Sequence, residues 1–60
     1  MENYWFVEHE TGEEFFVQAK SRTEAFEIAK GLEWEDIEPD LECYGIVSDD
    51  TADWMGLDTY

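Results

Sequence analysis

Basic residues are scarce in this 60-residue sequence: three Lys and Arg stand against 17 Asp and Glu, and the formal net charge is −14. The three, Lys20, Arg22 and Lys30, all lie between positions 20 and 30. A chain with this balance meets nucleic-acid phosphates and anionic membranes with charge of the same sign. The composition therefore argues strongly against direct binding to nucleic acid and disfavours membrane surfaces.

Cysteine and long apolar runs are also missing. Cys43 is the only cysteine, so no disulfide can form within the chain, and no cysteine cluster can hold a metal. A lone cysteine in a strand-like run is more often a small buried hydrophobic residue than a nucleophile. No stretch approaches the about 20 apolar residues of a membrane-spanning helix, and the N-terminal residues lack the features of a signal peptide. We expect a cytoplasmic, reducing location.

The usual arrangements of catalytic and metal-binding residues are absent as well. His9 is the only histidine, and its place between Glu8 and Glu10 predicts an exposed turn residue. There is no G-x-S-x-G motif and no glycine-rich phosphate loop, and the aspartates do not follow the spacing of a calcium-binding EF-hand. Sixty residues also leave little room for a pocket of about 300 Å³. We therefore expect no enzyme, no cofactor and no dedicated metal site.

Aromatic residues, by contrast, are abundant. They make up 17% of the chain and hydrophobic residues 43%, whereas disordered acidic segments contain few aromatics. This content predicts one folded, strongly acidic domain over residues 1–60. A domain this short buries only about 60% of its unfolded surface, so its stability is modest unless a partner or a second copy adds to it.

The pattern along the chain predicts an α+β fold in the order β-β-α-β-α. Strands are expected at 3–9 and 15–19 as a hairpin, and at 41–47, where Gly45 weakens the strand or marks a bulge. Ser21 and Glu24 form an S-x-x-E capping box before a helix that ends near Gly31. A short helix over 48–55 is preferred to a fourth strand over 52–57. The expected architecture is a three-stranded antiparallel sheet with a helix packed on one face.

Both faces of this sheet are apolar near the hairpin. Side chains alternate along a strand, so Tyr4 and Phe6 face one side while Trp5 and Val7 face the other, and Phe15 and Phe16 divide in the same way. Only one full-length helix is available to cover them. The second face, with Trp5, Val7 and Phe16, is therefore expected either to pack against the C-terminal helix or to form a homodimer interface.

The sequence after Lys30 holds ten acidic residues and no basic one. Such a run is usually a solvated surface, but a dozen carboxylates on a compact surface also approximate the field of a short DNA duplex. Trp34 lies among these acids, and tryptophan is enriched at binding hot spots, which favours mimicry; core packing of Trp34 is the alternative. The predicted partner-binding residues are Glu33, Trp34, Glu35, Asp36, Glu38, Asp40, Asp49, Asp50 and Asp53.

In length, charge and aromatic content the chain resembles the small acidic proteins that bacteriophages use against host defences, among them nucleic-acid-mimicking anti-CRISPR and anti-restriction proteins. The run FFVQAKSRTEAFEIAK at 15–30 also looks like a segment common in small phage-encoded proteins, and the sequence ends in MGLDTY. The resemblance is one of overall character and carries over no functional residue. It implies a stoichiometric inhibitor that acts in a bacterial host.

Two functions follow as hypotheses. The first is a non-enzymatic inhibitor that occupies the basic groove of a nucleic-acid-binding protein or nuclease complex in place of DNA or RNA. It predicts an affinity that falls steeply with salt. The second is a small phage or mobile-element structural or adaptor protein that homodimerises through the apolar sheet face. It predicts weak salt dependence and sensitivity to substitution of Trp5 or Phe16.

Overall fold

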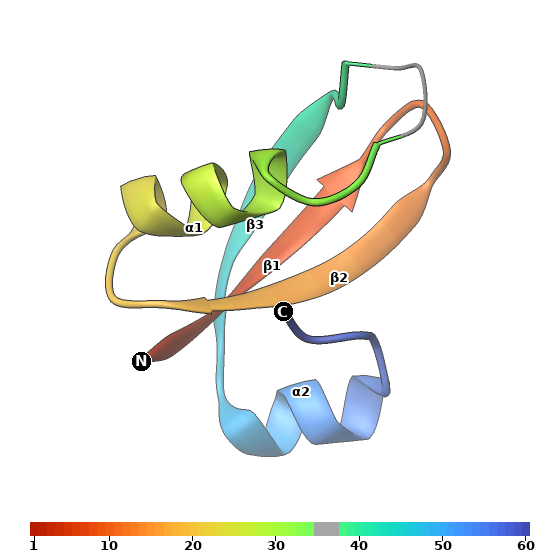
Figure 1. Cartoon of the computed structure of the whole chain (residues 1–60). Helices are drawn as coiled ribbons and strands as arrows, with labels where there is room; N and C mark the ends of the chain where they lie inside the picture. Colours follow the sequence, from red (N-terminus) through yellow and green to blue (C-terminus); the bar gives the residue numbers. More distant parts are fainter. Residues whose placement is uncertain (35–37) are drawn as a thin grey trace.

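Strands and helices follow one another in the predicted order (Figure 1). This computed structural model describes residues 1–34 and 38–60. Its elements are β1 (Glu2–Glu8), β2 (Glu13–Ala19), α1 (Arg22–Lys30), β3 (Leu41–Val47) and α2 (Asp49–Met55). The strands form one sheet in the order β2-β1-β3, and both pairings are antiparallel. The predicted α+β fold is confirmed.

The capping residues fix where α1 begins. Ser21 has an extended backbone, and its Oγ accepts a hydrogen bond from the Glu24 N–H at 3.2 Å, which satisfies one free donor of the first turn. The Glu24 carboxylate reaches back to the Lys20 N–H at 3.5 Å, one residue before the return partner of a regular capping box. Ala25 and Ala29 are fully buried, because they lie on the helix face that packs on the sheet.

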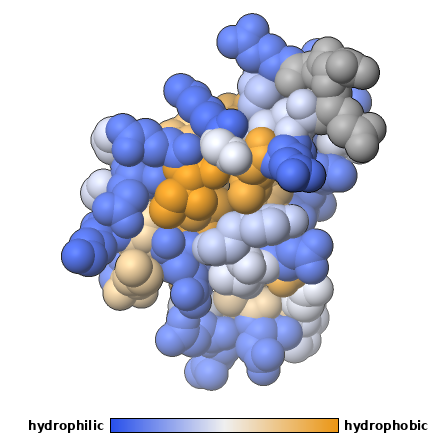
Figure 2. Space-filling model, in the orientation of Figure 1, coloured by the Kyte–Doolittle hydropathy of each residue, from blue (hydrophilic) through white to orange (hydrophobic). Residues whose placement is uncertain are grey.

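The main core lies between α1 and the sheet. Alternation along β1 and β2 places Tyr4, Phe6, Phe15 and Val17 on this face, where all four are buried. The Phe6 ring stacks on Phe15 with centroids 5.7 Å apart and meets the edge of Phe26 at 4.9 Å. Figure 2 shows hydrophobic side chains gathered between α1 and β2, with hydrophilic residues around them. Hydrophilic residues therefore occupy most of the surface around these side chains on the face that Figure 2 shows.

The predicted irregularity in β3 is a β-bulge. Trp5 pairs with Gly45, whereas the next residue, Phe6, pairs with Cys43, so Tyr44 is the extra residue. Gly45 has a φ of +131°, a backbone conformation that side-chain-bearing residues rarely adopt. Cys43 returns to the core face and is buried, as predicted for a small hydrophobic residue.

The second helix lies on the opposite side of the sheet from α1 (Figure 1). Ser48 caps α2 by accepting a hydrogen bond from the Thr51 N–H at 3.2 Å. Gly56 ends the helix in the left-handed conformation, with a φ of +69°, and turns the chain back toward the sheet. The preference for a helix over a fourth strand at 52–57 is therefore confirmed.

After α2 the chain runs beside the outer edge of β2. The Phe16 N–H donates to the Asp58 carbonyl at 2.8 Å, and the Tyr60 N–H donates to the Phe16 carbonyl at 2.9 Å. Thr59 thereby forms an isolated parallel bridge with Phe16, which the sequence pattern did not indicate. The last residues cover part of an edge that otherwise offers free backbone groups to another chain.

Candidate interaction surface

Exposed carboxylates occur on every element and on the connecting segments of the described chain. Among the acidic residues at 1–34 and 38–60, Glu8 alone is buried and Glu24 alone is half-buried. The exposed acids are Glu2, Glu10, Glu13, Glu14, Glu27, Glu33, Glu38, Asp40, Glu42, Asp49, Asp50, Asp53 and Asp58. The negative charge therefore surrounds the fold and is not confined to the segment after Lys30.

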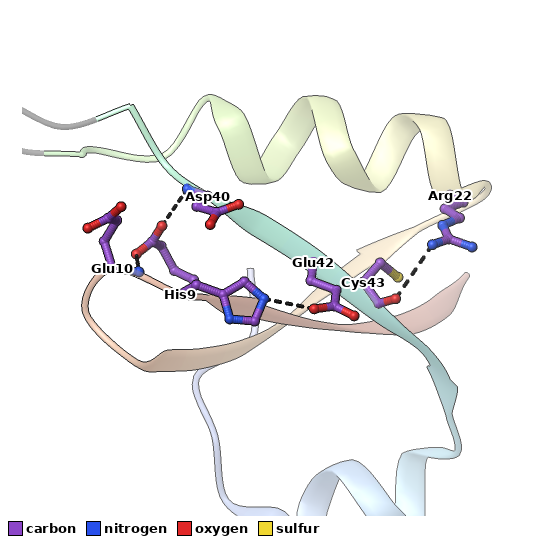
Figure 3. A network of polar contacts seen from close by, with 7 residues as sticks. His9, Glu10, Arg22, Asp40, Glu42 and Cys43 are labelled. Carbon is purple, nitrogen blue, oxygen red and sulfur yellow. Dashed lines mark hydrogen bonds and ion pairs between the residues drawn. The ribbon is translucent and has the colours of Figure 1, made fainter.

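The few basic groups do little to neutralise this charge. Within residues 1–34 and 38–60, the only ion pair is between His9 Nε2 and Glu42 Oε1, 2.7 Å apart (Figure 3). His9 is exposed, as predicted, but it contacts β3 instead of facing only solvent. The Arg22 guanidinium donates to the Cys43 carbonyl at 3.5 Å and lies 5.9 Å from the centre of the Phe26 ring. It is thus engaged with the fold itself.

Glu8 joins the turn after β1 to the segment before β3. Its side chain is 0% exposed. One carboxylate oxygen accepts hydrogen bonds from the N–H groups of Glu10 at 2.5 Å and Thr11 at 3.0 Å. The other oxygen accepts one from the Asp40 N–H at 2.5 Å; Glu10 and Asp40 are labelled in Figure 3. The His9 N–H also donates to the Asp40 carbonyl at 3.0 Å. These bonds fix Asp40 against the hairpin turn.

The same environment determines the charge state of Glu8. Burial acts to raise the pKa of the Glu8 carboxyl, but the hydrogen bonds from the Asp40, Thr11 and Glu10 backbone outweigh it, and the pKa lies below the usual value of 4.5. Glu8 is therefore ionised at neutral pH. We assign it a structural role, because its oxygens are occupied by backbone donors.

The helix α2 carries a second group of predicted contact residues. Asp49, Asp50 and Asp53 are all exposed on it, and the helix has no basic residue in its last turn. Trp54 is 85% exposed, so it contributes almost nothing to the core. Residues four apart lie on the same side of a helix, which places Asp50 beside Trp54 and Asp49 beside Asp53. One side of α2 thus pairs a carboxylate with a large exposed aromatic ring.

An open cleft of about 380 Å³ separates α2 from the sheet. Its lining residues are Asn3, Gln18, Asp49, Ala52, Asp53, Gly56, Leu57 and Thr59. The volume falls at the lower end of the range of about 300 to 1,000 Å³ for small-molecule sites. The expectation that so short a chain leaves little room for a space of this size is therefore wrong.

A hydrogen-bonded series of side chains forms one wall of the cleft. Gln18 Nε2 donates to Asn3 Oδ1 at 3.2 Å, and Asn3 Nδ2 donates to Asp49 Oδ1 at 2.6 Å and to the Val47 carbonyl at 3.4 Å. Asn3 is 4% exposed, and both the oxygen and the nitrogen of its buried amide are hydrogen-bonded, as buried polar groups usually are. The series connects β2, β1 and α2, and it holds the Asp49 carboxylate in place.

Trp34 has a different environment from that of Trp54. Its ring is half-buried and packs against the core, 6.0 Å from the Phe15 ring, and its Nε1 donates to the Ala29 carbonyl at 2.9 Å. Glu33 and Glu38 are exposed near it in the sequence. The predicted contacts Glu35 and Asp36 lie outside the described residues. Trp34 is therefore largely occupied by the fold, which leaves Trp54 as the more exposed tryptophan.

The residues expected on the second sheet face differ in their exposure. Phe16 is 0% exposed within the single chain, whereas Trp5 and Val7 are half-buried. The Trp5 ring meets Tyr44 edge to face at 5.1 Å. Its Nε1 is buried and has no hydrogen-bond partner in the described part of the chain. This face thus retains only partial exposure, which is less than a free apolar sheet face offers.

The sequence reasoning missed two features of this surface, the cleft and the exposed Trp54. Asn3 and Gln18 are directly paired in the hairpin and face the same side as Phe16. Two opposed amides on an otherwise apolar face were a signal that this end of the face is not dry core. No signal in the sequence distinguished the exposure of Trp54 from that of Trp34.

Two further properties concern the described chain as a whole. Among residues 1–34 and 38–60, no three His, Cys, Asp or Glu side chains are grouped so that they could hold a metal ion. No helix in the same residues is both long and apolar enough to cross a membrane.

No protein-family model matches this sequence, and neither a curated protein nor a solved structure shows significant similarity to it. The functional argument therefore depends on the chain's own residues.

Proposed function

We propose that this chain is a non-enzymatic inhibitor that binds a basic nucleic-acid-handling protein and occupies its nucleic-acid groove. The observation that carries the proposal is the distribution of unneutralised carboxylates over an elongated surface. The molecule measures 34 × 21 × 16 Å and bears a net charge of −14. A DNA duplex of the same length carries about 20 charges. The two charge densities are therefore of the same order, and a groove built for one attracts the other.

The exposure of Trp54 favours a surface that binds a protein partner over one that serves only solubility. Tryptophan is the residue type most enriched at binding hot spots, and its ring also binds Arg and Lys side chains through cation–π contacts. At 85% exposure, Trp54 gives the fold little packing energy. Its position beside Asp50 offers an arginine both an aromatic face and a counter-charge. Trp54 is thus the aromatic anchor that we assign to the partner interface, in place of Trp34.

Homodimerisation through the apolar sheet face has less support. Phe16, the central residue of that interface, is already buried inside one chain. Two copies would also bring together net charges of −14 each, and this repulsion opposes association. Catalysis is not favoured either, because Asp49 and Asp53 are exposed to solvent, whereas general acid–base groups are usually tuned by burial.

The resemblance to small acidic phage proteins suggests the kind of partner. A nuclease or another nucleic-acid-binding component of a bacterial defence complex, of the CRISPR or restriction type, carries the basic groove that this surface complements. The inhibitor would act in the cytoplasm of the bacterial host, by blocking the groove stoichiometrically.

Capture followed by competition tests the proposal. The tagged chain is immobilised, exposed to bacterial lysate and eluted with a salt step, and each eluted protein is identified by mass spectrometry. Each is then bound to a labelled DNA duplex or RNA, and displacement by the chain is titrated. We expect a basic nucleic-acid-binding protein that is released by moderate salt, and displacement that weakens as salt rises.

Charge reversal supplies the control. Glu33→Lys, Glu38→Lys and Asp50→Lys together are expected to weaken displacement by about a hundredfold or more, because like charges then face each other across the interface. Glu33→Gln, Glu38→Gln and Asp50→Asn at the same positions should have an intermediate effect. Circular dichroism must show that both variants are folded. Undiminished displacement by the reversed variant, or partners that bind no nucleic acid, would contradict the proposal.

A further inference from the structure

We propose that the cleft between α2 and the sheet binds the guanidinium group of an arginine side chain. This inference deepens the proposed function and depends on it for the source of the arginine, which is the groove of the basic partner. It concerns Asp49 and Asp53 together with the amides of Asn3 and Gln18, all of which line the cleft.

The carboxylate oxygens that line the cleft receive few hydrogen bonds from the protein itself. The Asn3 amide uses its N–H groups on Asp49 Oδ1 and the Val47 carbonyl, and Gln18 donates to Asn3 Oδ1. Asp49 Oδ2 and both oxygens of Asp53 receive no hydrogen bond from the described residues. The Cβ atoms of residues four apart on a helix are about 5 to 6 Å apart, so the two carboxylates point from one side of α2. A ligand that fits this arrangement must supply several N–H groups and positive charge.

Arginine matches these requirements better than the other cations of proteins. Its planar guanidinium presents five N–H donors, whereas a lysine ammonium presents three around a single nitrogen. The apolar stem of arginine also needs a surface, and Ala52 and Leu57 line the same cleft. A metal ion fits less well, since no group of three or more acidic, histidine or cysteine ligands is assembled in the described residues.

The site is partly organised before any ligand binds. Asn3 is almost completely buried, and it fixes the Asp49 carboxylate through a hydrogen bond of 2.6 Å. Gln18 fixes the other end of the Asn3 amide from β2. A carboxylate held in this way loses less side-chain entropy on binding than one on a free surface. The second carboxylate, Asp53, has no such restraint and can move to meet the guanidinium.

Nuclear magnetic resonance of the full ¹⁵N-labelled chain tests the site directly. The probe is N-acetyl-arginine N-methylamide, and its citrulline counterpart is the uncharged control of nearly the same shape. We expect the arginine compound to shift the backbone amide signals of Asn3, Gln18 and Ala52 in a saturable manner, and the citrulline compound to leave them in place. Equal shifts with both compounds, or shifts spread evenly over the acidic surface, overturn the proposal.

Two matched variants separate the cleft from the general field. Asp53→Asn and Asp50→Asn remove the same charge from the same helix, but only Asp53 lines the cleft. Asp53→Asn is expected to weaken binding of the arginine compound by about tenfold, the loss typical of one charge-assisted hydrogen bond. Asp50→Asn should change it less than twofold, because Asp50 does not line the cleft and gives the ligand no hydrogen bond there. Equal effects of the two variants overturn the proposal.

The same pair of variants distinguishes this inference from the proposed function. If the chain displaces nucleic acid from a captured partner, but Asp53→Asn and Asp50→Asn reduce the displacement equally, the cleft proposal fails and the inhibitor proposal stands. If the arginine compound binds the cleft with the expected variant pattern, but no captured protein loses nucleic acid to the chain, the inhibitor proposal fails and the arginine site stands.

Discussion

At the scale of single residues, Glu8 is the clearest case of a charge with a structural role. It accepts three backbone hydrogen bonds while fully buried, and its pKa is lowered. In Glu8→Gln an amide N–H₂ replaces one of the oxygens and faces a backbone N–H, so two donors oppose each other. We expect a lower melting temperature for Glu8→Gln at pH 7, measured by circular dichroism.

The lowered pKa of Glu8 also predicts how the effect of Glu8→Gln on the melting temperature changes with pH. A carboxyl whose pKa is lower in the folded state stabilises the fold at pH values above its unfolded pKa, near 4.5, and this contribution is lost as the pH falls through the folded pKa. The difference in melting temperature between the wild type and Glu8→Gln should therefore shrink on acidification below pH 4.5. The matched control is Glu10→Gln in the same turn, where the side chain is exposed. A difference that grows at low pH would contradict the assignment.

Single positions were predicted well from the sequence where the residue type has few possible roles, and poorly where it has several. Cys43 was expected to be buried and is, since a small apolar side chain in a strand has few other roles. Trp34 and Trp54 are chemically identical, and only the three-dimensional neighbourhood separates them. The Trp34 ring reaches Phe15 and the Ala29 carbonyl, whereas Trp54 lies on the outer side of a short helix. Local pattern therefore could not identify the exposed tryptophan.

At the scale of elements, the end of α2 depends on a left-handed residue. Gly56 has a φ of +69°, and a Cβ added there would meet no atom within 4 Å, so only backbone strain opposes a side chain. Gly56→Ala is expected to destabilise the fold by about 1 kcal/mol, since the left-handed conformation costs a residue with a Cβ about 1 to 2 kcal/mol. For a domain of this size the melting temperature should fall by about 5 °C.

The matched control for this prediction is Gly31→Ala at the end of α1. Gly31 has a right-handed φ of −81°, and its added Cβ would make ordinary contacts of 3.5 Å with two helix carbonyls. Alanine there reduces the entropy of the unfolded chain without straining the folded one, so the melting temperature should be unchanged or slightly higher. Equal losses in both variants would show that the backbone conformation at Gly56 is not the cause.

Elements with their own start and stop signals were predicted well. The Ser21 and Ser48 caps, the Gly45 bulge and the Gly56 termination are local, because they depend on a few neighbouring residues. The cleft and the pairing of Thr59 with Phe16 depend on where α2 comes to lie against the sheet. The Phe16–Thr59 and Asn3–Asp49 contacts join residues more than 40 positions apart, and no periodicity along the chain encodes them.

At the scale of the whole molecule, the charge that serves binding opposes folding. A net charge of −14 is confined within a radius of gyration of 10.9 Å, which is comparable with the Debye length of about 10 Å in 0.1 M salt. In 0.01 M salt that length is about 30 Å, so most pairs of carboxylates then repel each other across the molecule. We expect the melting temperature to rise by about 5 °C between 0.01 and 0.5 M sodium chloride. Thermal unfolding followed by circular dichroism checks this, and potassium chloride should give the same result.

Affinity for a basic partner should respond to salt in the opposite direction, because the attraction is screened together with the repulsion. The variant with Glu33→Gln, Glu38→Gln and Asp50→Asn should show a smaller rise in melting temperature with salt and a weaker partner affinity, since both effects have one origin. A melting temperature that does not change with salt would mean that the repulsion is negligible. If it is present, a groove rich in Lys and Arg relieves it, and partner binding stabilises the fold beyond the contacts that the groove makes.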